Sequence, residues 1–229
     1  MNAKDYKLIS SSALFAGLSQ QECGRLLEFL KASENEYKAG ELLHVPGAEL
    51  KRFGFVLSGL VQVYRAGEGG RILMESAAPG GSFCAALCFL GVKNAPVEVT
   101  AAEDSRVLWL SPDSVREGCG AKLSDSAFSS EFVQDVTVRI AEFFAAQTLA
   151  MNSRIQVLTQ KSLRKKIMTL LAQYSEGAGK AFSIPFGREE MAVHLGCDRS
   201  ALSRELAAMK KDGMIDYYKN SFKVMKYEQ

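Results

Sequence analysis

The chain has 229 residues, of which 47% are hydrophobic and 24% are charged. This balance is typical of a globular protein and argues against disorder. The formal net charge of +2 indicates no particular class of partner. No run of about 18 apolar residues occurs, so we expect no membrane-spanning segment. The first residues lack the apolar core of a signal peptide, and we expect a cytoplasmic protein.

The charges are unevenly distributed along the chain. Residues 160–229 hold 13 Lys/Arg and 8 Asp/Glu, a balance of +5, whereas residues 1–159 hold the other 15 and 18, a balance of −3. A basic C-terminal segment is what binding to phosphate groups requires. The alternative is chance variation over a short segment.

The cysteines do not form the pattern of a disulfide framework. Their number is five and their spacing is irregular, in a chain long enough to bury a core. We therefore expect reduced thiols. The five are Cys23, Cys84, Cys88, Cys119 and Cys197.

The N-terminal segment, residues 8–31, is predicted to be helical. Leucines recur at helical intervals from Leu14 to Leu30. Ser19 and Glu22 have the spacing of a capping box, which marks the start of a helix.

Short apolar runs separated by glycines fill the region from Tyr37 to Leu110. Such runs, bounded by turn signals, predict an antiparallel β-sandwich or jelly roll. Residues 82–90 interrupt this pattern and are predicted to be helical, because they are rich in Ala, Leu and Phe without β-branched residues. A further strand is predicted over residues 97–101, directly after Pro96.

One long helix is predicted from Ser126 to Leu158, because no Pro or Gly interrupts a spacing of three and four. Its length is roughly 45 Å, and a helix this long with a narrow apolar stripe usually packs on a copy of itself. The alternative is burial along its own sandwich. We expect both contacts at once, the second through Phe132, Phe144 and Leu149. The stripe consists of Val133, Val136, Ile140, Phe143, Gln147 and Ala150.

After a break at residues 159–162, Ser162 is placed to cap a helix from Leu163 to Ser175. A strand is predicted within residues 181–186, closed by Pro185. The last element before the C-terminus is predicted to be a hairpin, with strands over residues 214–218 and 221–225. Its turn falls at Lys219-Asn220.

Between these elements lie two short predicted helices, joined by a tight turn at Gly196. A short helix with a polar, arginine-bearing face, supported by a partner helix, has the geometry needed to reach base edges in the DNA major groove. The first hypothesis is therefore a DNA-binding regulator. The polar side of the second helix carries Arg199, Ser200, Ser203 and Arg204, and its apolar side carries Leu202, Leu206 and Met209.

The whole pattern predicts an α+β protein in three parts. In this order the elements resemble the CRP/FNR superfamily of bacterial transcription regulators over nearly the whole chain. The resemblance implies that residues 1–124 form a β-sandwich sensor domain, residues 125–158 a dimerisation helix, and residues 159–229 a winged helix-turn-helix domain. The strongest match is Arg188–Ile215, and Pro79–Phe83 is similar to a glycine turn of that family's sensor domain.

The resemblance implies a homodimer that binds a two-fold symmetric operator in double-stranded DNA, with RNA polymerase as a further candidate partner. By position, Arg199, Ser200 and Arg204 fall where the family places base-contacting side chains. Ser200 departs from the glutamate of the best-known members, so a different operator is expected. The alternative for each of these residues is a solvated surface group. Plausible phosphate contacts are Arg188, Lys219 and Asn220.

The sensor domain departs from the family's cyclic-AMP-binding members, which carry Gly-Glu and Arg-Ser at two positions of the pocket. Here those positions are Ala85-Ala86 and Ala95-Pro96. A buried phosphodiester without its cation is strongly penalised, so we predict that cyclic AMP is not the effector. A small, largely apolar or aromatic molecule is expected instead, unless side chains fill the pocket. The predicted lining is Phe83, Ala85, Ala86, Leu87, Ala95, Pro96, Val97 and Met151.

An alternative is a redox- or metal-responsive regulator that uses Cys84 and Cys88, which are four residues apart on a predicted helix. Burial in an apolar segment favours core packing for both thiols. Cys23 stands alone near the N-terminus, so an iron–sulfur cluster is not expected. His44 is the only histidine in the sandwich, which is too few ligands for a catalytic metal site. We therefore expect no enzyme, no metal and no cofactor.

Effector binding is predicted to change how the two long helices of the dimer pack. A hinge near Thr159–Ser162 would pass this change to the DNA-binding domains as a population shift.

Overall fold

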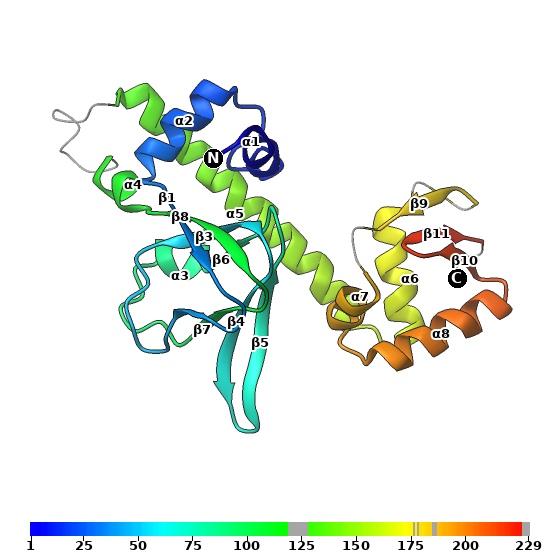
Figure 1. The fold of residues 1–229 in the computed structure, drawn as a ribbon. Helices are drawn as coiled ribbons and strands as arrows, with labels where there is room; N and C mark the ends of the chain where they lie inside the picture. Colours follow the sequence, from blue (N-terminus) through cyan, green and yellow to red (C-terminus); the bar gives the residue numbers. More distant parts are fainter. Residues whose placement is uncertain (119–127, 176, 178, 185–186, 226–229) are drawn as a thin grey trace. The chain divides into compact units, whose positions relative to one another are not determined.

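The computed structural model describes residues 1–118, 128–175, 177, 179–184 and 187–225. The chain divides into two compact units, Met1–Ala145 and Ala146–Gln229. One long helix, α5 (Ser130–Leu158), contributes residues to both units. Figure 1 labels the helices and strands along the chain. Among the described helices, none combines the length and the apolar character that crossing a membrane requires.

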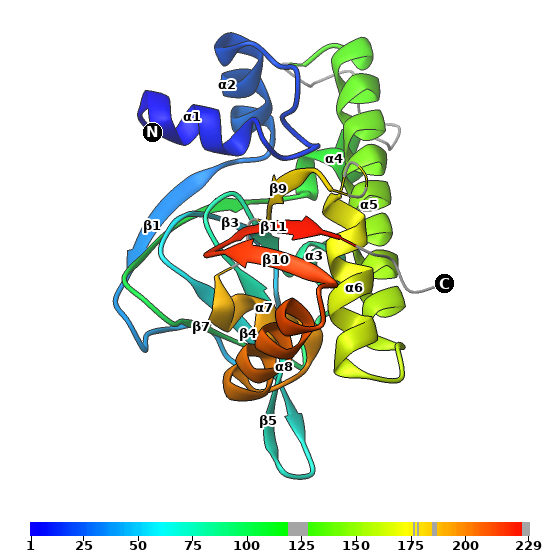
Figure 2. The same cartoon turned by 90° about the vertical axis from the view of Figure 1, so that its right-hand side faces the viewer.

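The first unit contains the predicted antiparallel β-sandwich. Its two four-stranded sheets have the strand orders β1-β8-β3-β6 and β2-β7-β4-β5. Valines of both sheets, among them Val56, Val63 and Val107, meet in one buried cluster. Figure 2 shows the β4–β5 hairpin projecting beyond the other strands of this unit. The strands are β1 (Ser33–Tyr37), β2 (Leu42–His44), β3 (Phe53–Ser58), β4 (Val61–Gly67), β5 (Gly70–Ala77), β6 (Ser82–Phe83), β7 (Glu98–Ala101) and β8 (Ser105–Leu110).

The segment predicted to be helical, residues 8–31, is only partly helical, because turns separate two helices within it. Helix α1 (Ala3–Ile9) ends before a serine-rich turn, and α2 (Gln20–Phe29) begins anew. The predicted capping box is confirmed: the Ser19 hydroxyl accepts from the Glu22 amide at 3.3 Å, and the Glu22 carboxylate accepts from the Ser19 amide at 2.8 Å. Leu14 of the intervening turn and the leucines of α2 face the same core, which explains their helical spacing.

The helix predicted over residues 82–90 is shorter than expected. Helix α3 (Ala85–Phe89) begins only after Ser82 and Phe83, which pair with β3 as strand β6. A second short helix, α4 (Asp113–Gly118), follows the sandwich. Its Arg116 donates to the Phe89 carbonyl at 2.9 Å, so α4 helps to close the C-terminal end of α3.

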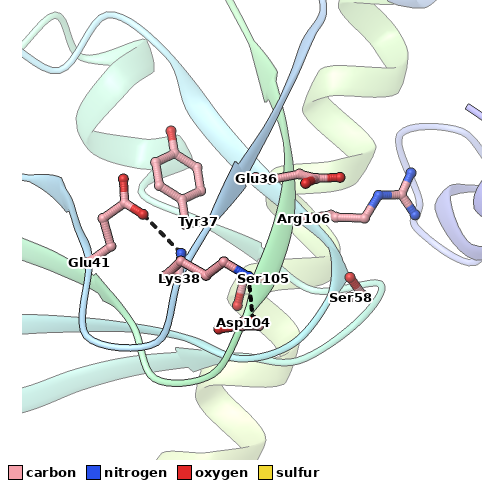
Figure 3. A pocket seen from close by; sticks show the side chains of 8 residues that line it. All are labelled: Glu36, Tyr37, Lys38, Glu41, Ser58, Asp104, Ser105 and Arg106. Atoms are coloured by element: carbon pink, nitrogen blue, oxygen red, sulfur yellow. Dashed lines mark hydrogen bonds and ion pairs between the residues drawn. The ribbon is translucent and has the colours of Figure 1, made fainter.

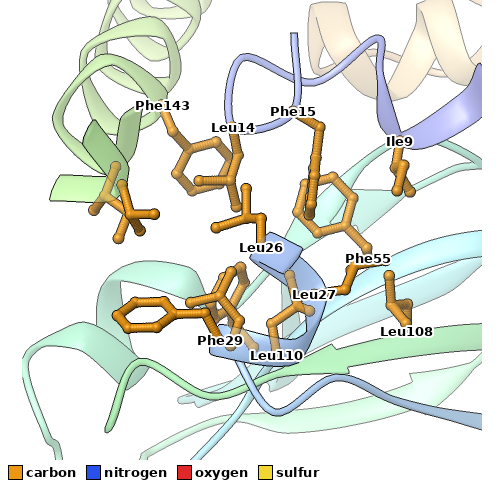
Figure 4. Close-up of a cluster of buried hydrophobic side chains, with 14 of the residues drawn as sticks. Ile9, Leu14, Phe15, Leu26, Leu27, Phe29, Phe55, Leu108, Leu110 and Phe143 are labelled. Carbon is orange, nitrogen blue, oxygen red and sulfur yellow. The ribbon is translucent and has the colours of Figure 1, made fainter. Parts of the chain in front are cut away.

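Aromatic side chains fill the core between the sandwich and the helices of the first unit. Phe143 of α5 lies 6.3 Å, centroid to centroid, from both Phe53 and Phe55, and Phe15 meets Phe55 edge-on at 5.8 Å. Figure 4 shows Leu26 among these groups. Edge-to-face and tilted aromatic pairs add about 0.5–1.5 kcal/mol each beyond their buried area.

The structure changes the assignment of the faces of α5. The first part of the predicted dimer stripe, Val133 to Phe143, is buried in the chain's own core, and Phe132 and Phe144 pack against that core as well. Leu149, expected to contact the sandwich, is 68% exposed. Phe143 faces its own core because the aromatic cluster there provides contacts that a solvent-facing position would lack.

A different face of α5 is exposed, and we refer to it as the outer stripe. Its residues recur every three or four positions and are small or apolar except for the last. Val138 is 52% exposed. The predicted start of the helix, Ser126, lies outside the described residues. The outer stripe consists of Val138, Ala141, Ala145, Leu149 and Asn152.

The second unit combines helices with a small antiparallel sheet of strand order β10-β11-β9. Ser162 caps α6 as predicted, accepting from the Lys165 amide at 3.2 Å. The end of α5 belongs to this unit: Val157 is fully buried in its core, and Gln173 donates to the Ser153 carbonyl at 3.1 Å. The predicted strand end at Pro185 lies outside the described residues. The elements are α6 (Leu163–Tyr174), β9 (Ala181–Ser183), α7 (Arg188–Leu195), α8 (Arg199–Lys211), β10 (Ile215–Tyr218) and β11 (Ser221–Val224).

Candidate nucleic-acid interface and effector site

The corner between α7 and α8 depends on Gly196. This residue has φ +64°, the left-handed conformation that glycine adopts without a Cβ penalty. The amide of Cys197 then donates back to the Ala192 carbonyl at 3.0 Å, which closes the helix end. A Cβ at Gly196 would also lie only 3.4 Å from the Leu158 side chain. The predicted turn is therefore present, and it joins the two helices of a helix-turn-helix.

Helix α8 has two chemically different faces. Leu202, Leu206 and Met209 are fully buried in the core of the second unit. In both views α8 lies beside β10, which helps to support it. The opposite face is exposed and consists of the four predicted DNA-contacting residues, Arg199, Ser200, Ser203 and Arg204.

Among the described residues, the contacts of the two arginines of this face are weak. The Arg199 guanidinium lies 3.2 Å from the Glu189 carboxylate, and the two side chains are 66% and 74% exposed. Arg204 donates to the Ser200 carbonyl at 3.4 Å. Exposed ion pairs contribute about 0–1 kcal/mol, so either guanidinium can exchange its partner at little cost.

Arg164 of α6 fixes the orientation of α8 from behind. Its guanidinium donates to the Glu205 carboxylate at 2.6 Å and to the Asp212 carboxylate at 2.7 Å. Hydrogen bonds to these two carboxylates raise the pKa of Arg164 above its ordinary value. Sequence reasoning missed this role. The available signal was a pair of acidic residues two helical turns apart, which places both carboxylates on one face of α8.

The β10–β11 hairpin, which we call the wing, carries the other candidate DNA contacts. Its two-residue turn consists of Lys219 and Asn220, both exposed, as predicted from the sequence. Arg188, the first residue of α7, is only half-buried, and its guanidinium donates to the Lys219 carbonyl at 2.7 Å. The structure thus brings all three predicted phosphate contacts together.

The predicted effector residues have different surroundings. Phe83, Ala95 and Val97 are buried in the cluster between the sheets, with the partly buried Leu87 packed against it. Ala85 is buried in the neighbouring core on the other side of α3. Two residues are exposed, namely Ala86 and Pro96. Met151 belongs to the second unit, where it is 65% exposed.

Phe83 can lie against the sheet because residue 54 is a glycine. A Cβ at Gly54 would collide with the Phe83 ring, which is the cross-strand partner in the β3–β6 pair. On the β8 side, Trp109 meets Phe83 edge-on at 5.4 Å. Strand β3 thereby positions the aromatic wall of the candidate effector site.

A carboxylate that the sequence reasoning did not include lies beside this wall. Glu75 of β5 is half-buried, and its side chain accepts from the Cys84 amide at 3.5 Å. Burial raises the pKa of Glu75. The sequence of β5 does not alternate between apolar and polar residues, so only the structure shows that Leu73, Glu75 and Ala77 are less exposed than their neighbours.

A surface depression of about 270 Å³ lies elsewhere on the sandwich (Figure 3). None of the predicted effector residues lines it. Lys38 pairs with Asp104 at 2.9 Å, and the Lys38 amide donates to Glu41 at 2.9 Å. Because its charges largely satisfy one another, this depression does not support an effector assignment. Its lining is Glu36, Tyr37, Lys38, Glu41, Ser58, Asp104, Ser105 and Arg106.

Cys84 and Cys88 are expected to react slowly with thiol reagents. Both are buried, and burial raises the pKa of each thiol to about 12. The reactive thiolate is therefore about three orders of magnitude rarer at pH 7 than for an exposed cysteine. In a Cys119→Ser background, we expect labelling at least 100-fold slower than at the half-buried Cys197. Equal labelling rates at the three sites would contradict this picture. Cys119 itself lies outside the described residues.

A β-sandwich, a long helix and a winged helix-turn-helix define a two-domain protein with a sensor-type domain and a DNA-binding-type domain. The model of the cyclic nucleotide-binding domain family matches residues 34–121, and that of the Crp-like helix-turn-helix domain matches residues 138–229. The chain belongs to the CRP/FNR superfamily, as its sequence motifs predict.

Individual relatives agree with this family. The transcriptional activator protein FnrL of Cereibacter sphaeroides is 33% identical over 87 residues, which cover 34% of this chain and 35% of FnrL. The match thus spans about a third of that relative. A structure of CprK complexed with OCPA has a TM-score of 0.62 at 17% identity, covering 88% of this chain and 91% of CprK. The c-di-GMP-responsive regulator CLP of Xanthomonas campestris has a TM-score of 0.58 at 15% identity, covering 91% and 100%. These structural likenesses establish the fold.

Within the described part of the chain, no group of three His, Cys, Asp or Glu residues could hold a metal ion.

Proposed function

We propose that this protein is a homodimeric, sequence-specific DNA-binding transcription regulator controlled by a small-molecule effector. The observation that carries the proposal is the exposed face of α8, where Arg199 and Arg204 stand on a helix whose other face is fully buried. A helix fixed in this way presents its guanidinium groups in a defined direction, which base recognition requires.

Each arginine can donate two hydrogen bonds to O6 and N7 of a guanine, worth about 1–3 kcal/mol of discrimination. The hydroxyls of Ser200 and Ser203 can donate or accept, so they tolerate more than one base edge. Lys219 and Asn220 of the wing are placed to contact phosphate oxygens, which position the protein without reading the sequence.

The outer stripe of α5 is the surface we assign to the partner subunit. Small and apolar residues that recur every three or four positions allow two helices to approach closely along one seam. A two-fold axis along this seam gives two copies of α8. The operator then has two symmetric half-sites about one helical turn, 10–10.5 base pairs, apart.

The proposed effector is a small, largely apolar or aromatic molecule that binds near Phe83, Leu87 and Val97. The positions that hold cyclic AMP in related proteins are occupied by Ala85-Ala86 and Ala95-Pro96, which provide neither a carboxylate nor a cation. Glu75 adds a carboxyl group and no cation to this region. Both features disfavour a phosphodiester.

Cyclic AMP is accordingly expected to change neither the melting temperature nor DNA binding. A ligand at 100 times its Kd stabilises the folded state by about 2.7 kcal/mol, which a thermal-shift assay detects readily. Clear stabilisation by micromolar cyclic AMP would show that the pocket is assigned wrongly.

The proposed signal is a shift between two arrangements of the dimer, and it requires that the effector bind one of them more tightly. The hinge near Thr159–Ser162 stays a prediction. Val157 and Ser153 belong to the second unit, where Val157 is part of the core and the Ser153 carbonyl accepts from Gln173, so the last turns of α5 can move together with the DNA-binding elements.

The redox alternative finds less support. A redox sensor needs an accessible thiolate of low pKa. Cys84 and Cys88 have the opposite properties, because both are buried and have raised pKa values.

Selection from a random DNA pool tests the proposed function. Purified protein is expected to enrich one two-fold symmetric sequence with half-sites one helical turn apart. Enrichment of asymmetric sequences, or of none, would contradict the proposal.

A further inference from the structure

Arg188 connects the start of α7 to the wing. It is the first residue of α7, and the preceding Gly187 is fixed because its amide donates to the Glu190 carboxylate at 2.7 Å. From this anchored position the guanidinium extends to Lys219, whose carbonyl it reaches at 2.7 Å. The contact spans 31 positions of sequence and joins the two parts of the candidate DNA-binding surface.

Two aromatic rings of the wing surround the same guanidinium. Its central carbon lies 5.1 Å from the Tyr217 ring centroid and 5.0 Å from that of Phe222. These rings are cross-strand partners, with centroids 5.7 Å apart and planes at 31°. A planar guanidinium can lie over an aromatic face and still donate hydrogen bonds at its edge, which a lysine ammonium cannot do in the same way.

The turn that Arg188 contacts has an unfavourable backbone conformation. Lys219 has φ +51°, in the left-handed region that residues other than glycine rarely adopt. Two-residue hairpin turns require such positive φ values, and asparagine or glycine usually supplies them. Here a lysine does so. A hydrogen bond to its carbonyl helps to hold this conformation.

We propose that Arg188 is a positioning residue that holds the wing turn in place, and that it acts on DNA through Lys219 and Asn220 rather than by contacting a phosphate itself. This inference rests on the proposed DNA-binding function. It replaces the phosphate contact predicted for Arg188 from the sequence, because the guanidinium already has partners in the wing.

A double-mutant cycle separates the two roles. The variants are Arg188→Met, Lys219→Met and the double variant, each measured against the DNA site selected by the wild-type protein. If Arg188 acts through the wing, the double variant binds no more weakly than Arg188→Met alone. If Arg188 contacts its own phosphate, the two losses multiply, and the double variant lowers the slope of log K against log salt by about 0.9 more than Arg188→Met does alone.

Hydrogen exchange of the full-length protein without DNA supplies an independent readout. We expect the amides of residues 215–224 to exchange at least tenfold faster in Arg188→Met than in the wild type. Lys219→Met is the matched control and should leave exchange within twofold of wild type. Arg188→Lys keeps the charge but loses the planar stack, so it should resemble Arg188→Met.

Unchanged exchange in both Arg188 variants, or wild-type DNA binding by Arg188→Lys, would overturn the inference. If the wild-type protein selects no DNA site, the proposed function fails, and the exchange measurement still decides whether Arg188 holds the wing. A variant that does not fold is recognised by its melting curve, and the other Arg188 variant then decides.

Discussion

Replacing Arg199 or Arg204 by alanine is expected to lower the preference for the selected operator over scrambled DNA by about 5- to 150-fold. This range corresponds to the roughly 1–3 kcal/mol that a bidentate arginine–guanine contact contributes. Both side chains are exposed on α8, and the buried leucines opposite them fix the helix. Stability should change little, because the contacts that the two side chains make with described residues are weak surface contacts. Fluorescence anisotropy with the two DNA duplexes measures the effect.

Two controls make this result specific to base reading. Lys211→Ala removes an exposed cation from the C-terminal end of the same helix, and we expect the preference to fall less than twofold. Arg199→Lys keeps the charge but loses the fork geometry, so selectivity should fall while the salt dependence stays near that of the wild type. An Arg199→Ala protein with undiminished preference for the operator would remove this residue from the reading surface.

The second large effect is expected for Ala145→Glu in the outer stripe of α5. A carboxylate at the centre of a helix–helix seam is buried without a partner in both subunits, at a cost of about 3–5 kcal/mol. We therefore expect the dimer dissociation constant to rise by at least 100-fold. Light scattering after size exclusion should show a monomer at micromolar concentration, and operator affinity should fall with it.

Ala146→Glu is the matched control. Residue 146 is also exposed, but it lies about 100° around the helix from residue 145. The same charge at this position should leave the dimer intact. If both variants stay dimeric, or if both dissociate, the outer stripe is not the dimer surface.

Local sequence signals predicted the DNA-binding unit well because each has a short-range physical cause. A glycine at position 196 takes the left-handed conformation without strain. The apolar spacing of Leu202, Leu206 and Met209 matches one face of a helix. Ser162 caps α6 by accepting from the backbone amide of Lys165, only three residues away. These elements do not depend on distant parts of the chain.

The faces of α5 could not be assigned in the same way. Periodicity identifies a buried stripe but does not say what buries it, and Phe143 is covered by the chain's own aromatic cluster. The turn between α1 and α2 was missed for a related reason, because Leu14 of this turn and Leu26 of α2 enter the same core and mimic a single helical period.

Contacts between distant charged residues were also beyond the sequence. Arg164 meets Glu205 and Asp212 only after α6 and α8 pack together. Arg188 meets the wing only when the hairpin returns to the start of α7. Their residue types indicated positive charge, and only the folded arrangement shows that both guanidinium groups donate hydrogen bonds within the protein.

The central claim is that arginines of α8 read base edges in two symmetric half-sites. Protection of guanine N7 from methylation, measured on the selected operator, tests it most directly. We predict protected guanines in the major groove of both half-sites, with at least one in each half-site losing protection in the Arg199→Ala protein at saturating concentration. The account would be contradicted if the wild-type protein protected no guanine. It would also be contradicted if the Arg199→Ala and Arg204→Ala proteins both gave the same protection pattern as the wild type.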